Sequence, residues 1–444
     1  MRILVIGSGA REHALAWKLS AGASPADLFC VPGNPGIARH ARLLAADVAD
    51  PASLLDLVSR ERIDLTVVGP ELPLERGVTD AFRAAGRAIV GPSRAAAQLE
   101  TSKVFAKAFM ARHGVPTARH RACERPDDAL AVLRRGEFGY PIVIKADGLA
   151  AGKGVVVAPD SATAEEAIRA AMIDRRFGEA GARVVIEEFL RGTEASFFVL
   201  CDGRGALPLT SAQDHKRAFD DDQGPNTGGM GAFAPSPLVT PDVERRIMRE
   251  IVDPVLTGLQ SEGEEYSGFL YVGLMLTADG PRVVEFNVRL GDPEAQVVLP
   301  MIDADLLPLL QASASGELDR VRVRFSTAPH VGVVLASKGY PGAVENGKTI
   351  TGIELAERLD HVMVFHAGTA ERDGRLVTNG GRVLTVVGRG GAYAEAIRRA
   401  YEGVSRIAFE GMHYRRDIGR TALGHPSLGS PVGDPGRRGD VWTS

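Results

Sequence analysis

The chain has 444 residues, 45% of them hydrophobic, which is enough material for several domains with their own cores. Its 56 acidic and 52 basic residues leave a net charge of −4, and no apolar run is long enough to cross a bilayer, so composition argues against a nucleic-acid or membrane surface. The three cysteines lie far apart, without metal-type or redox-type spacing, and this favours a cytoplasmic enzyme without disulfides.

Strand and helix patterns alternate over residues 1–101. Glycine-containing turns follow the strands, at Gly7–Gly9, Pro32–Gly36 and Gly69–Glu71. This alternation predicts a doubly wound parallel sheet, in which ligands bind at the edge where the strands end. The predicted strands are Ile3–Gly7, Leu28–Val31, Leu65–Gly69 and Ala88–Gly91, and the predicted helices are Arg11–Ser20, Ala52–Arg60 and Leu74–Ala85.

The first turn, Gly7-Ser8-Gly9, is similar to a dinucleotide-binding loop but departs from it at two points. Glu12 stands where the third glycine belongs, and the second strand runs into Pro32 without the acidic residue that would hold a ribose. The start of the following helix still offers backbone N–H groups to an anion. We interpret this turn as a site for a sugar phosphate; for the segment alone, a tight turn without a ligand is an equally good interpretation.

The pattern changes at about Ser102. We predict an α+β domain over residues 102–325, with a lid subdomain at about 120–192 and a long polar loop at 220–231. The predicted helices are Lys103–Arg112, Ala129–Arg135, Ala164–Met172 and Val243–Gln260, and the predicted strands are Pro141–Lys145, Gly154–Ala158, Arg183–Glu187, Ala195–Cys201, Phe269–Leu276 and Pro281–Val288.

Two of these strands flank a glycine-rich hairpin at 148–154. It is one residue short of a P-loop, and a strand follows it instead of a helix. Such a hairpin can lay backbone amides over ATP phosphates, and Lys145, at the end of the preceding strand, can meet a phosphate as a point charge. A plain surface hairpin is the alternative.

The strand at 183–187 runs into a short hinge, Glu187–Leu190, with Glu194 close behind it. A hinge of this kind can give adenine backbone contacts and apolar walls, and a carboxylate can bind ribose hydroxyls. An ordinary strand end is the better interpretation if the segment stands alone. Farther along, Gln213–Arg217 and Pro225–Gly231 bracket the long loop, and this charged cluster beside glycines indicates a lid that grips substrate.

The predicted strand at 281–288 has two contrasting faces. Val284, Phe286 and Val288 lie on the apolar face. The opposite face carries Glu285, Asn287 and Arg289 and leads into the turn Gly291-Asp292-Pro293-Glu294. Two oxygen ligands at this spacing suit Mg²⁺, which takes its remaining ligands from phosphates and water, and an arginine suits a planar anion. A polar face on an edge strand is the alternative.

Short strands return beyond residue 325. Residues 326–422 are predicted to form a small α+β domain, and residues 423–444, rich in Gly, Pro, Ser and Arg, a disordered tail. The predicted strands are His330–Ala336, His361–Phe365 and Arg382–Gly388, and the predicted helix is Ala392–Val404.

The order of these motifs (anion turn, lysine with glycine hairpin, hinge, metal face) resembles the ATP-grasp superfamily. Longer strings are similar to the phosphoribosylamine–glycine ligase family from Met1 to about Arg420. Ala10, Thr101 and Leu290 depart from the family's usual Gly, Gly and Phe. The strings are AREHALAW (10–17), IKADGLAAGKGV (144–155), IEEFL (186–190), QDHKR (213–217), GPNTGGMGA (224–232), EFN-x-R-x-GDPE-x-Q (285–296) and TNGGRVL (378–384).

The resemblance implies an ATP-grasp fold in the central domain and an ATP-dependent ligase that joins glycine to 5-phosphoribosylamine through glycyl phosphate. It also implies Mg²⁺ or Mn²⁺ as cofactor and a chain that is a monomer or at most a weak dimer. The implied metal ligands are Glu285 and Asn287. The implied ATP-binding residues are Lys103, Lys145, Gly152, Gly154, Glu187, Glu188, Phe189, Leu190 and Glu194. The implied substrate-binding residues are Gly9, Asn34, Glu71, Gly291 and Asp292, together with Asp214 and Lys216, which we also expect to act in catalysis with Arg289.

Two alternatives remain open at this point. Another ATP-grasp ligase, such as a biotin-type carboxylase or a carboxyaminoimidazole synthetase, would use bicarbonate instead of glycine. A catalytically silent nucleotide-binding protein could keep the same fold, although the intact set of Lys145, Glu285, Asn287 and Arg289 argues against it.

Overall fold

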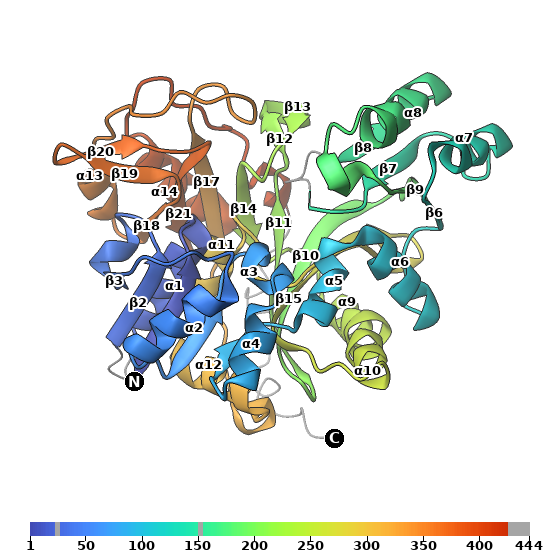
Figure 1. The fold of residues 1–444 in the computed structure, drawn as a ribbon. Coiled ribbons are helices and arrows are strands. Elements are labelled where there is room, and N and C mark those ends of the chain that lie inside the picture. The colour runs from blue at the N-terminus through green and yellow to red at the C-terminus, as the bar shows by residue number, and fades with distance from the viewer. Residues whose placement is uncertain (23–26, 150–153, 425–444) are drawn as a thin grey trace, which may run out of the picture.

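The computed structural model describes residues 1–22, 27–149 and 154–424. Figure 1 shows an N-terminal sheet with the C-terminal part of the chain above it, a long central sheet, and a small sheet that projects to the upper right. No helix in these residues is long and apolar enough to cross a membrane. The predicted tail lies outside the described residues from 425 onward.

The N-terminal sheet is parallel, with the strand order β3-β2-β1-β4-β5, which confirms the predicted doubly wound sheet. One predicted helix, 74–85, is wrong as a single element. Gly77 adopts a left-handed conformation with φ +82°, so one short helix ends there and a second begins. The elements are β1 (Arg2–Gly7), α1 (Ala10–Ser20), β2 (Asp27–Pro32), β3 (Arg42–Leu43), α2 (Pro51–Arg60), β4 (Leu65–Val68), α3 (Glu71–Glu75), α4 (Val78–Ala84), β5 (Ile89–Val90) and α5 (Arg94–Thr101).

The central sheet is antiparallel and runs through two of the predicted domains, in the order β16-β15-β10-β11-β14-β17-β21-β18. Its last three strands come from the C-terminal part and continue the sheet because β14 pairs with β17, with Gly231 opposite Val333. The elements before the junction are β10 (Thr193–Asp202), β11 (Ala206–Asp214), β14 (Gly231–Ala234), α9 (Pro241–Ile247), α10 (Asp253–Ser261), β15 (Ser267–Thr277), β16 (Gly280–Asn287), α11 (Ala295–Val298) and α12 (Leu306–Ser315). The elements after it are β17 (His330–Ala336), α13 (Ile353–Glu357), β18 (Val362–His366), β19 (Thr369–Arg372), β20 (Arg375–Thr378), β21 (Arg382–Arg389) and α14 (Tyr393–Val404).

The polar loop predicted at 220–231 is more ordered than expected. A hairpin of β12 (Arg217–Phe219) and β13 (Gln223–Asn226) forms most of it, and Asp221 and Asp222 adopt left-handed conformations at its tip. Period-2 alternation is missing from so short a hairpin, so the sequence pattern did not reveal it.

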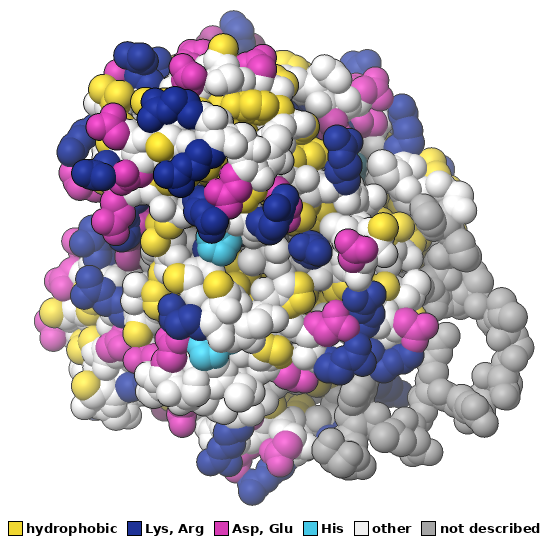
Figure 2. Space-filling model, turned by 90° about the vertical axis from the view of Figure 1, so that its right-hand side faces the viewer, with side chains coloured by type: hydrophobic (Ala, Val, Ile, Leu, Met, Phe, Trp, Pro, Cys, Tyr) yellow, Lys and Arg dark blue, Asp and Glu magenta, His cyan; other side chains and the backbone are white. Residues whose placement is uncertain are grey.

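The small sheet has the order β6-β9-β7-β8 and carries two helices. It falls within residues 120–192, for which a lid subdomain is predicted. On the face of the molecule that carries it, acidic and basic side chains are interspersed (Figure 2), which is typical of a solvent-exposed surface. Its elements, with the helix that leads into it, are α6 (Lys103–Arg112), β6 (His120–Cys123), α7 (Pro126–Arg135), β7 (Ile142–Ala146), β8 (Val155–Ala158), α8 (Ser161–Ile168) and β9 (Val184–Glu188).

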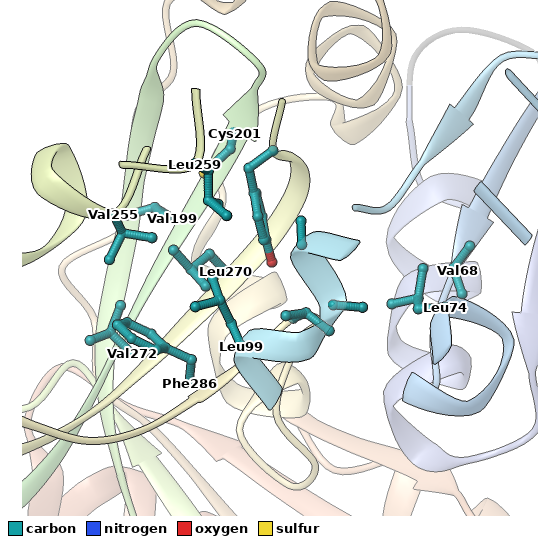
Figure 3. Packing of buried hydrophobic residues seen from close by; sticks show 14 of the residues in the cluster. Val68, Leu74, Leu99, Val199, Cys201, Val255, Leu259, Leu270, Val272 and Phe286 are labelled. Carbon is teal, nitrogen blue, oxygen red and sulfur yellow. The ribbon is translucent and has the colours of Figure 1, made fainter. Parts of the chain in front are cut away.

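Helix α5 joins the N-terminal sheet to the central sheet through one buried cluster. Figure 3 shows Leu99 of α5 beside Leu270 and Phe286 of the central sheet, while Val68 and Leu74 lie on the N-terminal side. All five side chains are buried. Because interiors pack as densely as organic crystals, this cluster fixes the ends of β4 and β16 relative to each other.

A tight backbone contact at Gly268 gives a first stability prediction. Gly268 has φ +104°, and a Cβ there would lie 2.9 Å from the Gly91 Cα and N atoms at the end of the N-terminal sheet. Gly268→Ala is therefore expected to lower the free energy of unfolding by about 3 kcal/mol, from backbone strain plus overpacking. Gly263→Ala is the matched control, because Gly263 has φ +86° but open space around it, and its cost should be only about 1 kcal/mol. Equal losses of melting temperature in the two variants would contradict the role of the Gly91 contact.

Candidate active site

The turn after β16 meets the first loop of the N-terminal sheet. A Cβ on Gly9 would lie 3.3 Å from Asp292 Oδ2, and Arg11 Nη1 donates a 3.1 Å hydrogen bond to the Leu290 carbonyl. Gly9 N itself donates to Glu12 Oε2 at 2.6 Å, so Glu12, which replaces the third glycine of a dinucleotide loop, caps the turn. The structure therefore brings Gly9, Gly291 and Asp292 together, although they are about 280 residues apart in sequence.

The predicted metal ligands lie at the C-terminal end of strand β16. Glu285 is paired with Gly273 of β15, and Asn287 with Tyr271. A Cβ on Gly273 would lie 3.2 Å from Glu285 Cγ, so this glycine makes room for the carboxylate. Among the described residues, neither Glu285 nor Asn287 forms a side-chain hydrogen bond or ion pair. A half-buried carboxylate and an amide that have no partner among those residues are a donor set that fits Mg²⁺. Those residues contain no cluster of three or more His, Cys, Asp or Glu ligands, so an ion here would need further ligands such as phosphate oxygens.

The alternation predicted for β16 is correct for Phe286 and Val288 but wrong for Val284. The register between β15 and β16 shifts at Gly273/Leu274, and the resulting bulge places Val283 in the core instead. The Val284 carbonyl is thereby free to accept a 3.0 Å hydrogen bond from Lys145 Nζ. The bulge thus links the strand that carries the predicted metal ligands to Lys145, the residue predicted to meet a phosphate.

Arg289 is held by two carboxylates from the N-terminal region. Its Nε lies 3.2 Å from Glu71 Oε2, and its Nη2 lies 2.7 Å from Glu100 Oε1. Burial alone would lower the pKa of Arg289, but Glu100 and Glu71 raise it above its ordinary value. The side chain is 16% exposed, so its guanidinium is fixed in orientation but still reachable. Sequence reasoning missed Glu100, which lies near the end of an amphipathic helix and has no local signal of its own.

A buried cluster of two lysines and one glutamate lies at the small sheet. Lys145 Nζ and Lys107 Nζ are each 3.1 Å from Glu187 Oε2, and all three side chains are at most 5% exposed. Burial would raise the pKa of Glu187, but the two lysines lower it; burial lowers the pKa of Lys107 to about 8, against the opposing effect of Glu187. Glu187 Oε1 has no hydrogen-bond partner in the described part of the chain.

Lys107 was not predicted as a functional residue. It lies one helical turn after Lys103 on α6, and this i, i+4 spacing places both lysines on one face, which is the signal that could have identified it. Lys103 Nζ is 3.4 Å from the Gly148 carbonyl at the start of the glycine hairpin. Burial lowers the pKa of Lys103, and Glu285 opposes this effect.

The two glutamates of the hinge point to opposite faces of β9. Glu187 faces the lysines, whereas Glu188 accepts hydrogen bonds from Arg119 N at 2.9 Å and Arg119 Nε at 2.7 Å. Phe189 is partly exposed beyond the strand end. Gly152 lies outside the described residues, and Gly154 closes the hairpin by accepting a 2.8 Å hydrogen bond from Ala146 N.

Three predicted residues meet at the end of β11. Lys216 Nζ lies 2.7 Å from Glu194 Oε2 and 3.4 Å from Asp214 Oδ1. Burial raises the pKa of Asp214; Lys216 keeps a pKa above its ordinary value in spite of burial because Asp214 and Glu194 surround it. The loop at 226–231, called the Gly-rich loop below, holds this cluster in place. Its Thr227 N and Oγ1 both donate to the Lys216 carbonyl, at 2.7 and 2.9 Å.

Asn34 lies at the second turn of the N-terminal sheet with its side chain fully engaged. Nδ2 donates to the carbonyls of Ser8 and His366, both at 2.8 Å, and Oδ1 accepts from Ile37 N at 2.9 Å. These bonds join the first two turns to the end of β18.

The turn after β16 carries a buried acid, Glu294, whose titration gives a pH prediction. Burial, with Asp214 as the next cause, raises the pKa of Glu294 from 4.5 to about 7. The folded protein therefore keeps this proton up to about pH 7 while the unfolded chain releases it near 4.5, so Glu294 makes stability fall as pH rises through this window, by up to about 3 kcal/mol. We expect the melting temperature of Glu294→Gln, taken relative to that of the wild type, to rise by about 2–3 °C from pH 5 to pH 8. The measurement is made without nucleotide and divalent metal. A constant difference across that range would contradict the shift.

Three family models match most of the chain. Residues 1–100 match the N domain of phosphoribosylglycinamide synthetase, residues 101–295 its ATP-grasp (A) domain, and residues 330–421 its C domain. The chain is 49% identical to the phosphoribosylamine–glycine ligase of Vibrio parahaemolyticus over 95% of this chain and 99% of that one. It is 51% identical to the protein of that name from Xanthomonas campestris over 95% of this chain and 98% of the relative.

Solved structures agree with these matches. A crystal structure of phosphoribosylamine–glycine ligase from Thermotoga maritima covers 94% of this chain and 100% of its own, with a TM-score of 0.83 and 36% identity. The biotin carboxylase domain of the Hydrogenobacter thermophilus 2-oxoglutarate carboxylase covers 93% of this chain and 91% of its own, with a TM-score of 0.70 at 17% identity, which shows a shared fold alone. The chain therefore belongs to the phosphoribosylglycinamide synthetase family, whose relatives named above are phosphoribosylamine–glycine ligases.

Proposed function

We propose that this protein joins glycine to 5-phosphoribosylamine at the expense of ATP, giving glycinamide ribonucleotide, ADP and phosphate. The proposal rests on the pair Glu285 and Asn287, whose side chains form no hydrogen bond or ion pair within the described part of the chain. This pair lies shortly before Asp292, which faces Gly9. The proposed metal face and the proposed sugar-phosphate loop would thus adjoin, and the full-length relatives of this chain carry this activity in their name. We further propose a cytoplasmic enzyme that works as a monomer or weak dimer.

ATP is proposed to lie between the small sheet and β16. Lys145 and Lys107 are already fixed by Glu187, and Lys103 points to the glycine hairpin, so three cations are available for the phosphates without a large rearrangement. The hinge from Glu187 to Leu190 would supply adenine contacts, Glu194 would bind the ribose, and Gly152 and Gly154 would cover the phosphates. Mg²⁺ or Mn²⁺, held by Glu285 and Asn287, would neutralise charge on the ATP phosphates.

The reaction is proposed to have two steps. A carboxylate oxygen of glycine attacks the γ-phosphorus, and ADP leaves, which produces glycyl phosphate. The amine of phosphoribosylamine then attacks the acyl carbon and loses a proton, and phosphate leaves as the amide forms. Both steps depend on positioning and charge stabilisation more than on covalent chemistry from the protein.

The side chains divide between these steps. Arg289, which Glu71 and Glu100 orient, would stabilise negative charge on the transferred phosphoryl group. Asp214 and Lys216 would grip glycine, whose ammonium and carboxylate groups match their opposite charges. Gly9, Gly291 and Asp292 would bind phosphoribosylamine, with Glu71 beside them and Asn34 holding the first two turns in place.

A direct test is to supply the purified protein with ATP, Mg²⁺, phosphoribosylamine and either [¹⁴C]glycine or [¹⁴C]bicarbonate. We expect label from glycine, and none from bicarbonate, in an acid-stable ribonucleotide product. Incorporation of bicarbonate, as in a carboxylase of the same fold, would overturn the proposal.

A further inference from the structure

Arg382 is the first residue of β21 and follows Asn379-Gly380-Gly381, a motif to which neither the ATP site nor the metal site gives a role. Its side chain extends from the C-terminal part of the chain and contacts two other segments. Nη1 donates to the Gly228 carbonyl at 2.6 Å and to the Asp292 carbonyl at 2.5 Å, and Nη2 lies 3.5 Å from Asp292 Oδ2. One guanidinium therefore joins the Gly-rich loop to the turn after β16.

The surrounding packing leaves this junction little freedom. A Cβ on Gly229, which has φ +111°, would lie 2.4 Å from Pro293 Cδ, so the loop lies directly against the turn. On its other side, Gly228 N donates a 2.9 Å hydrogen bond to the Tyr340 hydroxyl. The planar guanidinium of an arginine can contact two carbonyls and a carboxylate at once, whereas a lysine ammonium on a flexible side chain cannot hold the same arrangement.

The junction bears directly on Asp292. Its Oδ1 accepts a 2.7 Å hydrogen bond from Gln296 Nε2, and its Oδ2 faces Arg382 and lies 3.3 Å from the position that a Cβ on Gly9 would take. Burial would raise the pKa of Asp292, but Arg382 lowers it, so the carboxylate stays ionised beside the first turn of the N-terminal sheet. Arg382 itself remains 23% exposed at this point.

We propose that Arg382 is a positioning residue for phosphoribosylamine: it fixes the Asp292 carboxylate and the loop at 226–231 in the arrangement that captures the second substrate. This inference rests on the proposed function and adds a C-terminal residue to it. The contacts of Arg382 named above include no lysine of the ATP cluster and neither predicted metal ligand. Formation of glycyl phosphate should therefore survive loss of Arg382, while use of the amine should not.

The test compares Arg382→Lys and Arg382→Gln in the full-length chain with Arg389→Lys, an exposed arginine at the other end of the same strand. Two quantities are measured: the KM for phosphoribosylamine in the complete reaction, and glycine-dependent positional isotope exchange in [γ-¹⁸O]ATP, which reports the first step alone. We expect the KM for phosphoribosylamine to rise roughly 10- to 100-fold in both Arg382 variants, because a misplacement of about 1 Å costs on that order. Isotope exchange, and the KM values for ATP and glycine, should stay within about twofold of the wild type, and Arg389→Lys should change none of them.

An unchanged KM for phosphoribosylamine, or an equal loss of isotope exchange and complete reaction, would overturn the inference. A double-mutant cycle with Asp292→Asn adds a second check, because residues that act through one another are not additive: the double variant should be no worse than the poorer single variant. Fully additive losses would count against action through Asp292. If the wild type itself shows no glycine-dependent exchange, the proposed function fails and this inference fails with it, a result distinct from the variant outcomes.

Discussion

Replacing Glu285 by glutamine is expected to lower ligase turnover by about a thousandfold at ordinary Mg²⁺ concentration. The substitution keeps the size of the side chain but removes the charge of the one carboxylate in the pair proposed to hold the metal. A bound divalent cation is worth several kcal/mol of charge stabilisation in phosphoryl transfer, which corresponds to about three factors of ten in rate. Steady-state turnover at increasing Mg²⁺ and Mn²⁺ concentrations measures the effect, and part of it should be recovered at high metal concentration.

Asp279→Asn is the matched control for this variant. Asp279 lies at the turn between β15 and β16, at the far end of the same strand pair, and its side chain is 84% exposed. The same loss of one carboxylate charge there should leave turnover unchanged within about twofold, as for most surface substitutions. Near-normal turnover of Glu285→Gln at limiting Mg²⁺ would remove this residue from the metal site.

Replacing Glu187 by alanine is expected to destabilise the ligand-free protein by about 3–5 kcal/mol, because it leaves the buried ammonium groups of Lys107 and Lys145 without their common partner. ATP phosphates can take the place of that partner, so added nucleotide should raise the melting temperature of the variant more than that of the wild type. Thermal unfolding with and without ATP measures both effects.

Glu188→Ala provides the control on the same strand. Its carboxylate pairs with Arg119 on the opposite, more exposed face, and such a pair contributes less than about 1 kcal/mol. Similar losses in the two variants would contradict the assignment of the buried charge cluster to Glu187.

Periodicity and turn chemistry in the sequence were sufficient for much of the fold. Lys103–Arg112 and His330–Ala336 were predicted with the bounds that the structure shows, because each has a clear apolar pattern and, in the helix, a Ser102 cap that accepts from Phe105 N. The strand at β11 and the helix at α12 were missed. Helix α12 is apolar on more than one face, and β11 runs from apolar residues (ALPL) into mostly polar ones (TSAQD) on both faces, so neither shows the contrast on which a period depends.

For the side chains of the site, too, the sequence could predict some positions and not others. Asp292 and Gly9 follow strands of two sheets, and sequence could place each at a strand end but not the two side by side, since their contact depends on how α5 joins the sheets. Glu100 and Arg382 were beyond reach for a related reason. Each acts through a partner 90 or more residues away in the sequence, and local pattern carries no information about such pairs. The bulge that exposes the Val284 carbonyl to Lys145 was also invisible, because one extra residue changes the face of a strand without changing its composition.

One active site is proposed to couple ATP cleavage to amide formation between two specific substrates. The most direct measurement is ADP release by the purified protein with Mg²⁺ and ATP when glycine, phosphoribosylamine, both or neither are present. We expect rapid, stoichiometric ADP release only when both are present, and little release with either alone. Rapid release that ignores glycine, or that bicarbonate stimulates in its place, would contradict it.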